Sequence, residues 1–423
     1  MSAVPWSLLP DTASTADDGG LTIGGCAVAD LAARYGTPLF VYDEEHLRAR
    51  CREAVAGFGD GVAYATKAFL CRAMARLAHE EGLHLDVATD GEMHVALAAG
   101  VPAHRLVFHG NNKSDLELQA ARQAGVGRVV VDSFDEMDRL DRLFSDDSLV
   151  QTVLLRVTPG VEAHTHEFVR TGQDDSKFGF TLSTGAAAEA VERARRSPSM
   201  RLVGIHFHIG SQVFVADFFR QAVEAVAAWF NDLELPELSI GGGVGVAYVE
   251  GEEAPSIAEW AASVQEACAV AGITARVTGE PGRAIAAAAA VTVYRVGTVK
   301  ELPDIRTYVS VDGGMSDNPR PVLYGSGYET LLARAPRADR PRVVTVVGKH
   351  CESGDLLVRQ AHVPDDLAVG DLLVTPVTGA YGHSMGSNYN KVLRPAVVFV
   401  AGGQARLVVR RETPDDLLAA DVG

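Results

Sequence analysis

The sequence predicts an α/β fold in which a (β/α)8 barrel of the TIM type is followed by an all-β domain. Eight short, nearly continuous apolar runs recur between residues 62 and 279, and helix-like runs separate most of them. After residue 290 the chain becomes β-rich and is broken by Gly, Pro and Asp. Short continuous apolar runs are typical of parallel strands covered on both faces. About eight β/α units in roughly 220–250 residues favour the barrel over its alternative, a doubly wound open sheet.

Each expected element follows from this patterning. Residues 38–42 read as a strand that leads into the barrel, and residues 44–58 have helical composition. The barrel strands are expected at residues 62–66, 85–89, 106–109, 129–132, 153–157, 203–208, 238–240 and 275–279. The helices between them are expected at residues 72–81, 92–99, 116–125, 134–144, 186–196, 218–233 and 257–271. Later strands are expected at residues 291–296, 307–311, 343–347, 372–374, 396–400 and 405–409.

The change from alternating strand-like and helix-like runs to a β-rich pattern also predicts the domain boundaries. We expect the barrel over residues 37–285 and a β-sandwich or β-barrel domain over residues 286–423, joined by the N-terminal residues 1–36. A chain of 423 residues is long enough for two domains with sizeable cores. Its 47% hydrophobic and 22% charged residues are those of an ordinary soluble globular protein.

Charge and cysteine content restrict the partners and the compartment. The formal net charge of -17 argues against nucleic acid and anionic membranes as partners, while backbone N–H groups can still bind a small anion. The five cysteines are an odd number without a CxxC pair, which indicates a reducing cytoplasm. The N-terminus lacks a basic region and a sustained apolar stretch, so no signal peptide is expected. The Ala-rich run 284–290 is too short to span a bilayer.

Lys67 is the first candidate for chemistry. It follows the expected strand 62–66 and precedes a helix expected from about residue 69, so it lies at a strand end where an amine can be shielded from water. Desolvation lowers the pKa of a lysine and makes its free amine available as a nucleophile. Such a lysine can hold a carbonyl compound as a Schiff base, although most lysines at strand ends are simply solvated.

The ends of the last two barrel strands form a candidate phosphate site. The seventh strand leads into a glycine triplet at residues 241–243, and the eighth leads into the run from Glu280 to Arg283. Barrels often bind phosphate after strands 7 and 8, and glycines let backbone N–H groups approach it. Either motif alone is compatible with an ordinary turn. Glu280 could keep a ring nitrogen protonated, or could simply pair with Arg283.

Two histidines at alternate positions of the sixth strand, His206 and His208, are expected to face the same side. One interpretation is a metal site of the HxH type, with Asp86, His109 and Asp132 at other strand ends as further ligands. Another is a flat imidazole stacked on a cofactor ring, and a third is an ordinary core histidine for at least one of them. A metal site would leave the lysine and the glycine triplet without a role.

The β-rich part carries two unusual polar stretches, at residues 348–355 and 378–390. Loops this rich in Cys, Glu, Tyr and Asn are more often functional than structural. Cys351 follows Lys349 and His350, so it is either an activated thiol or a half-buried apolar filler.

In combination, these motifs resemble those of the fold-type III pyridoxal-phosphate decarboxylases, whose architecture is that of alanine racemase, and most closely the diaminopimelate decarboxylases of the actinobacterial type. The resemblance covers residues 19–418. The motifs that carry it are Tyr64-Ala65-Thr66-Lys67, His109-Gly110-Asn111-Asn112-Lys113-Ser114, His206 to Gln212, Gly241-Gly242-Gly243, Glu280 to Arg283, Asp312-Gly313-Gly314-Met315-Ser316-Asp317, His350 to Asp355 and Gly379-Ala380-Tyr381.

The resemblance implies decarboxylation of meso-2,6-diaminopimelate to L-lysine and CO2, the last step of lysine synthesis, with pyridoxal 5'-phosphate as cofactor. It implies that Lys67 holds the cofactor as a Schiff base, that His208 stacks on its ring, that Glu280 pairs with the pyridine nitrogen, and that Cys351 protonates the reacting carbon. The implied cofactor-binding residues are Lys67, Asp86, His208, Ser211, Gly241, Gly242, Gly243, Glu280, Gly282, Arg283 and Tyr381.

It further implies that Arg283, Arg320, Tyr324, Glu352 and Tyr381 bind substrate, that Glu352 recognises the distal amino group, and that no metal is needed. Cys351 and Glu352 would reach the active site from the second subunit of a cytoplasmic homodimer, with neither nucleic acid nor membrane as a partner.

Some positions depart from the family pattern. Asp90-Gly91-Glu92 stands where the family usually has Gly-Gly-Glu, and Gly382, His383 and Gly386 differ from the residues expected beside Tyr381 and Asn388. None of these changes removes a catalytic group. They leave open a paralogue that acts on another basic or acyl-linked amino acid.

Other functions are weaker alternatives. Amino-acid racemases share the architecture, but a Cys351–Glu352 loop suits decarboxylation better. A metal-dependent barrel hydrolase would depend on His206 and His208 alone and predicts bound zinc. A catalytically inactive binding protein would be expected to have lost Lys67 or Cys351, and both are present.

Overall fold

The computed structural model describes residues 3–144, 150–161 and 174–423, and the chain divides into two compact units. The barrel unit comprises Arg50–Val246 and Ala254–Ala284. The sheet unit comprises Met1–Ala49, Ala247–Glu253 and Ile285–Gly423. The domain boundaries expected at residues 37–285 and 286–423 stay a prediction.

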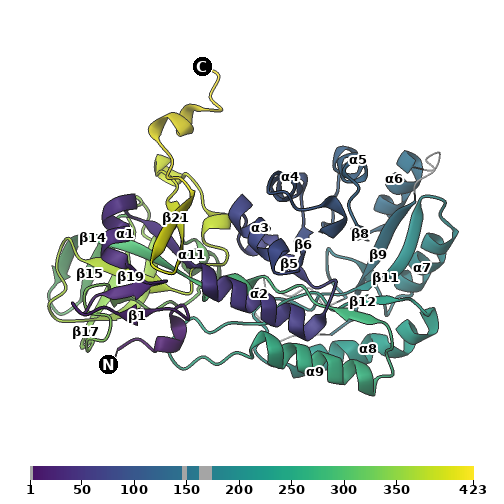
Figure 1. Ribbon diagram of the computed structural model, residues 1–423, viewed down its shortest axis with the longest axis horizontal. Helices are drawn as coiled ribbons and strands as arrows, with labels where there is room; N and C mark the ends of the chain where they lie inside the picture. The colour runs from purple at the N-terminus through teal and green to yellow at the C-terminus, as the bar shows by residue number, and fades with distance from the viewer. Residues whose placement is uncertain (1–2, 145–149, 162–173) are drawn as a thin grey trace. The chain divides into compact units, whose positions relative to one another are not determined.

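The barrel unit is built on parallel strands, as the sequence predicts (Figure 1). The strands are β5 (Ala63–Ala65), β6 (His84–Val87), β7 (Leu106–Phe108), β8 (Arg128–Val131), β9 (Gln151–Thr158), β11 (Met200–His206), β12 (Glu237–Ser239) and β13 (Arg276–Thr278). They pair in the order β13-β12-β11-β9-β8-β7-β6-β5, and the short β10 (Phe180–Thr181) adds to β9. Ala63 N–H donates to Gly279 O at 3.0 Å, and this bond joins β5 to the end of β13. The barrel is therefore nearly closed.

Helices follow the barrel strands at the predicted places. They are α3 (Arg72–Glu80), α4 (Asp90–Ala98), α5 (Asp115–Ala124), α6 (Phe134–Phe144), α7 (Ala186–Arg196), α8 (Asp217–Leu233) and α9 (Ile257–Val270), and α2 (Glu44–Phe58) precedes β5. Figure 1 shows α8 and α9 side by side. Ser114 and Ser256 begin α5 and α9 with capping boxes, in which the serine hydroxyl and a glutamate three residues later satisfy free backbone N–H groups.

The barrel strands are mostly buried. Every residue of β5, β6, β7 and β12 is buried, including the polar His84, Asp86, Glu237 and Ser239. Parallel strands place all their carboxyl ends at one edge of the barrel, and active sites of this fold lie there. The residues that follow β5, β7, β11, β12 and β13 therefore share this C-terminal edge.

The sheet unit contains a mixed sheet in the order β18-β17-β15-β14-β4-β20-β21, to which β16 and β19 add. Its strands are β4 (Leu39–Asp43), β14 (Ala290–Leu302), β15 (Arg306–Val311), β16 (Leu331–Leu332), β17 (Arg342–Val347), β18 (Leu356–Val363), β19 (Leu372–Pro376), β20 (Ala396–Ala401) and β21 (Gln404–Val409). The unit also holds a small sheet of β1 (Ser14–Thr15), β2 (Leu21–Ile23) and β3 (Cys26–Ala27), with helices α1 (Val28–Tyr35) and α11 (Arg320–Tyr324). The sequence did not predict β16 or β18.

The first expected strand forms, but not where it was expected. β4 pairs antiparallel with β14 and parallel with β20, so it belongs to the mixed sheet and not to the barrel. All five of its residues are buried. Its apolar composition suits a central position in either sheet, and only the choice of partner strands, which the local sequence does not encode, decides between them.

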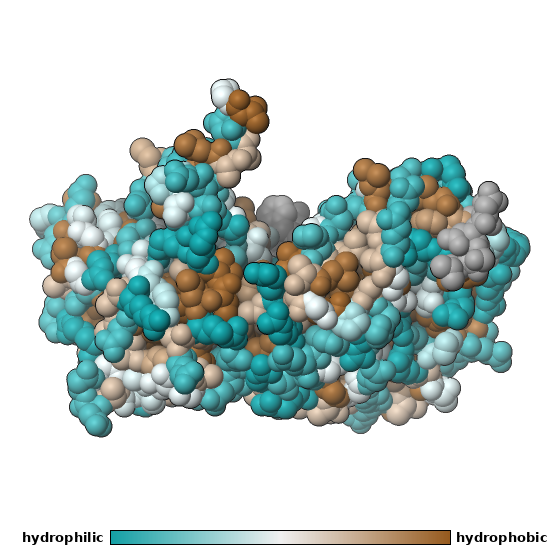
Figure 2. Space-filling view, turned by 45° about the horizontal axis from the view of Figure 1, so that its top comes forward, coloured by the Kyte–Doolittle hydropathy of each residue, from teal (hydrophilic) through white to brown (hydrophobic). Residues whose placement is uncertain are grey.

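The surface is polar in most places. Figure 2 shows small groups of hydrophobic residues interspersed among hydrophilic ones on the face drawn. Exposed apolar side chains include Leu116, Val270 and Ile305. Among the described residues, no helix combines the length and the apolar character needed to cross a membrane.

Candidate active site

Lys67 lies just beyond the end of β5, in a single turn of 3-10 helix at Thr66–Ala68. The expected strand through Thr66 ends at Ala65, and the expected helix from residue 69 begins only at Arg72. Lys67 is exposed in the single chain, so the shielding expected from its position is wrong for this structure. The reason is local, because the side chain projects from a turn beyond the strand and not from the buried strand itself.

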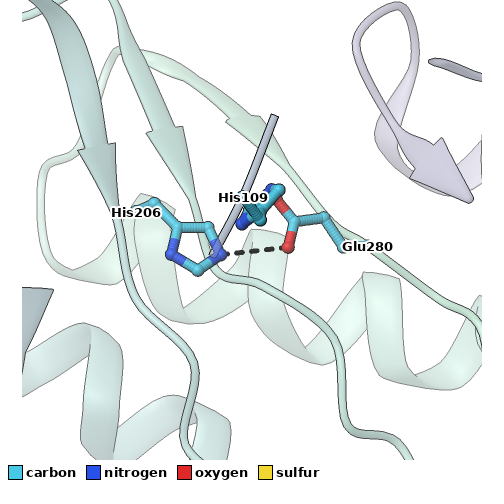
Figure 3. A group of neighbouring side chains, drawn as sticks. All are labelled: His109, His206 and Glu280. Atoms are coloured by element: carbon cyan, nitrogen blue, oxygen red, sulfur yellow. Dashed lines mark hydrogen bonds and ion pairs between the residues drawn. The ribbon is translucent and has the colours of Figure 1, made fainter. Parts of the chain in front are cut away.

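Three buried side chains meet at the C-terminal edge of the barrel (Figure 3). His206, the last residue of β11, has Nε2 3.0 Å from Glu280 Oε2, and Ser239 Oγ donates to Glu280 Oε1 at 2.9 Å. His109 Nε2 lies 3.4 Å from Glu280 Oε1, within ion-pair distance but outside good hydrogen-bond geometry. Figure 3 shows both imidazole rings next to the one carboxylate. Glu280 is thus fixed by residues that follow or end three other strands.

The side chains of this group shift one another's pKa values. Burial disfavours a charged Glu280, but His206 and His109 outweigh it and hold the pKa of that carboxyl well below its usual range. Burial lowers the pKa of His206 to about 4, so its ring is neutral and donates Nε2–H to the carboxylate. Burial also opposes a charge on His109, but Asp86 and Glu280 raise its pKa. The barrel therefore holds an ionised carboxylate at its C-terminal edge, out of contact with bulk water.

Asp86 is the second carboxylate near this group. It lies on β6, 7% exposed, with Oδ1 3.7 Å from His109 Nε2. Burial raises its pKa to about 6, while the charges of His109 and Lys67 act in the opposite direction. Besides burial, the charge of Lys67 also lowers the pKa of His208.

His208 follows β11 and faces the glycine loop. Its Nδ1 accepts a hydrogen bond from Gly242 N–H at 3.2 Å, so the other ring nitrogen carries the proton in the neutral form. Burial, followed by the charge of Lys67, lowers the pKa of His208 well below its ordinary value. His208 therefore presents a neutral ring whose orientation is set by a backbone bond.

The glycine triplet is required by close packing of neighbouring loops. A Cβ on Gly242 would lie 2.1 Å from Glu280 O, and one on Gly243 would lie 2.0 Å from Gly210 O. Gly243 also has φ +115°, which favours glycine. Next to this loop, Arg283 Nη2 donates to Ser211 Oγ at 3.0 Å. The loops after β11, β12 and β13 thus meet in one place.

These residues fit pyridoxal phosphate. The ionised Glu280 suits a protonated ring nitrogen, the neutral His208 suits a ring face, and Lys67 supplies the amine. Gly243 is half-buried, and its N–H has no acceptor among the described residues, so it can donate to a phosphate oxygen. Ser211 and Arg283 add a hydroxyl and a guanidinium beside it.

A metal interpretation has a geometric basis, although not the expected one. His109, His206 and Glu280 have ligand atoms within 4.8 Å of one another. His208 is not part of this group, which therefore differs from the HxH pair of the metal interpretation. The reason is that β11 ends at His206, and the strand alternation that would align His208 with it stops there. The direct bond between His206 Nε2 and Glu280 Oε2 forms without an ion.

Arg320 is the candidate anion-binding residue of the sheet unit. It is 4% exposed and donates from Nε to Tyr328 Oη and from Nη2 to Ser326 Oγ, both at 3.0 Å. Its guanidinium carbon lies 4.7 Å from the ring centroid of Tyr248 and 5.7 Å from that of Tyr324. No described carboxylate lies within ion-pair distance of it. A buried guanidinium held only by neutral groups fits a carboxylate ligand.

The remaining candidates of the sheet unit lie in loops. Cys351 and Glu352 are exposed, between β17 and β18, so the alternative of a half-buried filler is wrong for Cys351. Tyr381 is half-buried, follows β19 and has φ +60°. The carbonyl of Gly379 in the same loop accepts from Tyr42 Oη at 2.7 Å, which ties the loop to β4.

Sequence reasoning gave no role to several site residues. Ser239 ends β12 and holds Glu280, and its position at a strand end two residues before the glycines could have revealed it. Arg156, near the end of β9, lies 4.0 Å from Asp132 and influences the titration of His206 and His208. Each is a polar residue that interrupts an apolar segment near the end of its strand, and this interruption is the signal that the sequence offers.

Lys113 is a further residue whose role the sequence did not reveal. Its side chain is 1% exposed, and Nζ donates to Gly110 O, Val130 O and Glu136 Oε1, each at 2.7 Å. Glu136 Oε2 accepts from the backbone N–H of Asp132 at 3.0 Å. This buried ion pair joins the loop after His109 to the end of β8.

The chain matches known proteins over most of its length. Residues 44–287 match the family model of the pyridoxal-dependent decarboxylases, pyridoxal binding domain. A diaminopimelate decarboxylase of Mycobacterium tuberculosis is 49% identical over 432 aligned residues, which cover 97% of this chain and 96% of the relative. One of Corynebacterium efficiens is 46% identical, covering 99% of this chain and 95% of the relative.

Solved structures give the same result. A diaminopimelate decarboxylase from M. jannaschii in complex with L-lysine superposes with a TM-score of 0.89 at 29% identity, covering 98% of each chain. The enzyme from Helicobacter pylori, also in complex with L-lysine, superposes with a TM-score of 0.83 at 30% identity, covering 92% of this chain and 98% of the other.

Proposed function

The chain belongs to the diaminopimelate decarboxylase family of pyridoxal-dependent decarboxylases, and from this premise we propose how its own residues carry out the reaction. It decarboxylates meso-2,6-diaminopimelate to L-lysine and CO2 with pyridoxal 5'-phosphate, in lysine biosynthesis. The roles of individual residues rest chiefly on one observation, the buried Glu280 carboxylate that His206, His109 and Ser239 hold at the C-terminal edge of the barrel.

When bound, the cofactor takes up the electron pair left by the departing CO2. We assign to Glu280 the task of keeping the ring nitrogen protonated, because a carboxylate with a strongly lowered pKa stays an acceptor at neutral pH. Ser239 and His206 fix its two oxygens. His109 lies within ion-pair distance of both Asp86 and Glu280, which raise its pKa, and a positive charge on its ring would limit the repulsion between the two carboxylates.

The other barrel residues bind and orient. Lys67 is assigned the covalent attachment, and His208 the contact with the ring face, with Gly242 N–H holding the imidazole in place. Ser211, the N–H groups of Gly243 and Gly282, Arg283 and, from the sheet unit, Tyr381 are assigned to the phosphate. The glycines serve this role through their N–H groups, since the packing around them leaves no room for side chains.

The substrate has charged groups at both ends, and the remaining candidates carry the complementary charges. Arg320 with Tyr324, and Arg283, are assigned to substrate carboxylates, and Glu352 is assigned to the distal ammonium group. Binding of the distal end decides which carboxylate leaves, because it fixes the position of the reacting end. Cys351 is assigned the donation of a proton to the carbon that has lost CO2.

We propose that the enzyme is a homodimer in which Cys351 and Glu352 of one subunit serve the site of the other. The support is the family membership, together with the exposure of Cys351 and Glu352 in the single chain. The exposed apolar residues Val322 and Leu323 of α11, next to Arg320, are a further patch suited to a contact between subunits.

A cytoplasmic location is proposed from the five cysteines, all of which are free thiols.

The test is an absorbance spectrum of the purified protein with pyridoxal phosphate, before and after meso-diaminopimelate is added, with CO2 and lysine assayed in the same cuvette. A visible cofactor band with equimolar CO2 and L-lysine is expected. A band without turnover would point to another amino acid as substrate. No band would contradict the cofactor assignment and favour a metal at His109, His206 and Glu280.

A further inference from the structure

The loop that carries Cys351 and Glu352 is exposed, yet two neighbouring residues hold it in place. Asn390 Oδ1 accepts the backbone N–H of Cys351 at 3.2 Å. Tyr389 Oη donates to Glu352 Oε1 in a short hydrogen bond. These contacts join residues nearly forty positions apart in the sequence, so they are a feature of the fold and not of the loop alone.

The two holding residues are themselves anchored on His350, which is 7% exposed. The ring of Tyr389 lies 5.5 Å from that of His350, with 32° between the planes, and Asn390 Oδ1 lies 3.3 Å from His350 Nδ1. His350 is fixed in turn, because its N–H donates to Asp355 Oδ2 at 2.9 Å and its Nε2 lies 2.8 Å from Ser316 Oγ. A buried network therefore reaches the exposed Glu352 through Tyr389.

The contact leaves Glu352 one oxygen for another partner. Tyr389 bonds only to Oε1, and Oε2 has no partner among the described residues. An exposed glutamate ordinarily samples several rotamers, and ordering it at the moment of binding weakens the binding. A glutamate already held through one oxygen avoids this loss and presents the second oxygen in a defined direction.

We propose that Tyr389 is a positioning residue that sets substrate specificity by aiming Glu352 at the distal ammonium group of the diamino acid. The inference rests on the proposed role of Glu352 and extends it to a residue outside the assigned substrate set. Tyr389 acts through Glu352 and touches no substrate atom itself.

The test uses the holoenzyme and four variants. Tyr389→Phe removes the hydroxyl and keeps the ring on His350, Glu352→Gln removes the charge, and the double variant combines them. Tyr35→Phe is the matched control, since the hydroxyl of Tyr35 donates only to Ala405 O, at 3.4 Å. The readouts are kcat and KM for meso-diaminopimelate and, by calorimetry, the Kd of L-lysine and of 6-aminohexanoate, which is lysine without the α-ammonium group.

Tyr389→Phe is expected to raise KM and the Kd of L-lysine about tenfold, in line with the loss of a hydrogen bond to a charged group, with a smaller change in kcat. The Kd of 6-aminohexanoate is expected to stay within about twofold. This ligand lacks the α-ammonium group, which is the distal ammonium group that Glu352 is proposed to recognise. In the Glu352→Gln background, Tyr389→Phe is expected to have no further effect. Tyr35→Phe is expected to match the wild type.

Equal weakening of both ligands by Tyr389→Phe would overturn the inference, because it would indicate a general disturbance of the loop. Selective loss of lysine binding in Glu352→Gln without any in Tyr389→Phe would also overturn it, while leaving the role of Glu352 in place. If Glu352→Gln bound the two ligands with wild-type affinities, the proposed role of Glu352 would fail, and the inference with it.

Discussion

Replacement of Asp86 by asparagine tests the electrostatics of the barrel directly. Asp86 is 7% exposed, and its nearest charged neighbour is His109, 3.7 Å away. Burial raises its pKa from 3.8 to about 6, against the opposing attraction of His109. The folded protein therefore holds this carboxyl in its charged form at neutral pH at the expense of stability.

The sign and the magnitude follow from proton linkage. Between pH 3.8 and about 6 the folded state keeps a proton that the unfolded state has lost, so the stability of the wild type falls as pH rises through this window. At 1.36 kcal/mol for each pKa unit, the total loss is about 3 kcal/mol. Asparagine has nearly the same shape and no charge, so the stability of the variant does not fall as pH rises through this window.

We therefore expect Asp86→Asn to raise the free energy of unfolding by about 3 kcal/mol at pH 8 and to leave it unchanged near pH 4. Urea unfolding of the cofactor-free protein at several pH values measures the difference. Asp60→Asn is the control, because Asp60 is exposed and its pKa is lowered. Its replacement is therefore expected to change the free energy of unfolding at pH 8 in the opposite direction. A destabilised Asp86→Asn variant at pH 8, or a difference independent of pH, would refute the reasoning. Lower turnover in the stabilised variant would show that the charge serves function.

Three further substitutions test single assignments. Lys67→Ala is expected to abolish the visible absorbance of the cofactor-bound protein, and unchanged absorbance would remove Lys67 from its role. Cys351→Ala is expected to keep that absorbance and lose most turnover, and wild-type turnover would mean that another group donates the proton. Lys113→Met is expected to lower stability in urea unfolding by about 3–5 kcal/mol, because Glu136 would keep a buried charge without its cation, and a loss below about 1 kcal/mol would contradict the importance of that ion pair.

The barrel was predictable because its signal is local. Each of the eight strands formed within three residues of the expected bounds, since most of their residues are buried and stand in short segments rich in apolar side chains. The helices were predictable for a similar reason, because the composition of each segment is local information. The candidates that follow strand ends were identifiable for the same reason, since the carboxyl ends of parallel strands share one edge.

What depends on long-range pairing was not predictable. β4 is apolar enough for either sheet, and only its bonds with β14 and β20 decide its place. The meeting of His109 and Ser239 at Glu280 requires residues from three strands to converge, and no local pattern encodes it. Tyr389 is a single exposed tyrosine in sequence terms, and its contact with Glu352 exists only in the folded chain.

The most direct test of the account is Glu280→Gln, because the proposed chemistry depends on the charge of this buried carboxylate. The glutamine keeps the shape and the contact with Ser239 and removes the charge that would hold a ring nitrogen protonated. We predict that the variant retains the visible cofactor band but decarboxylates meso-diaminopimelate about 10²–10³ times more slowly, the loss usual for a group that stabilises developing charge. Turnover near the wild-type rate in a fully cofactor-loaded variant would contradict the assignment of Glu280 and the reading of the site built around it.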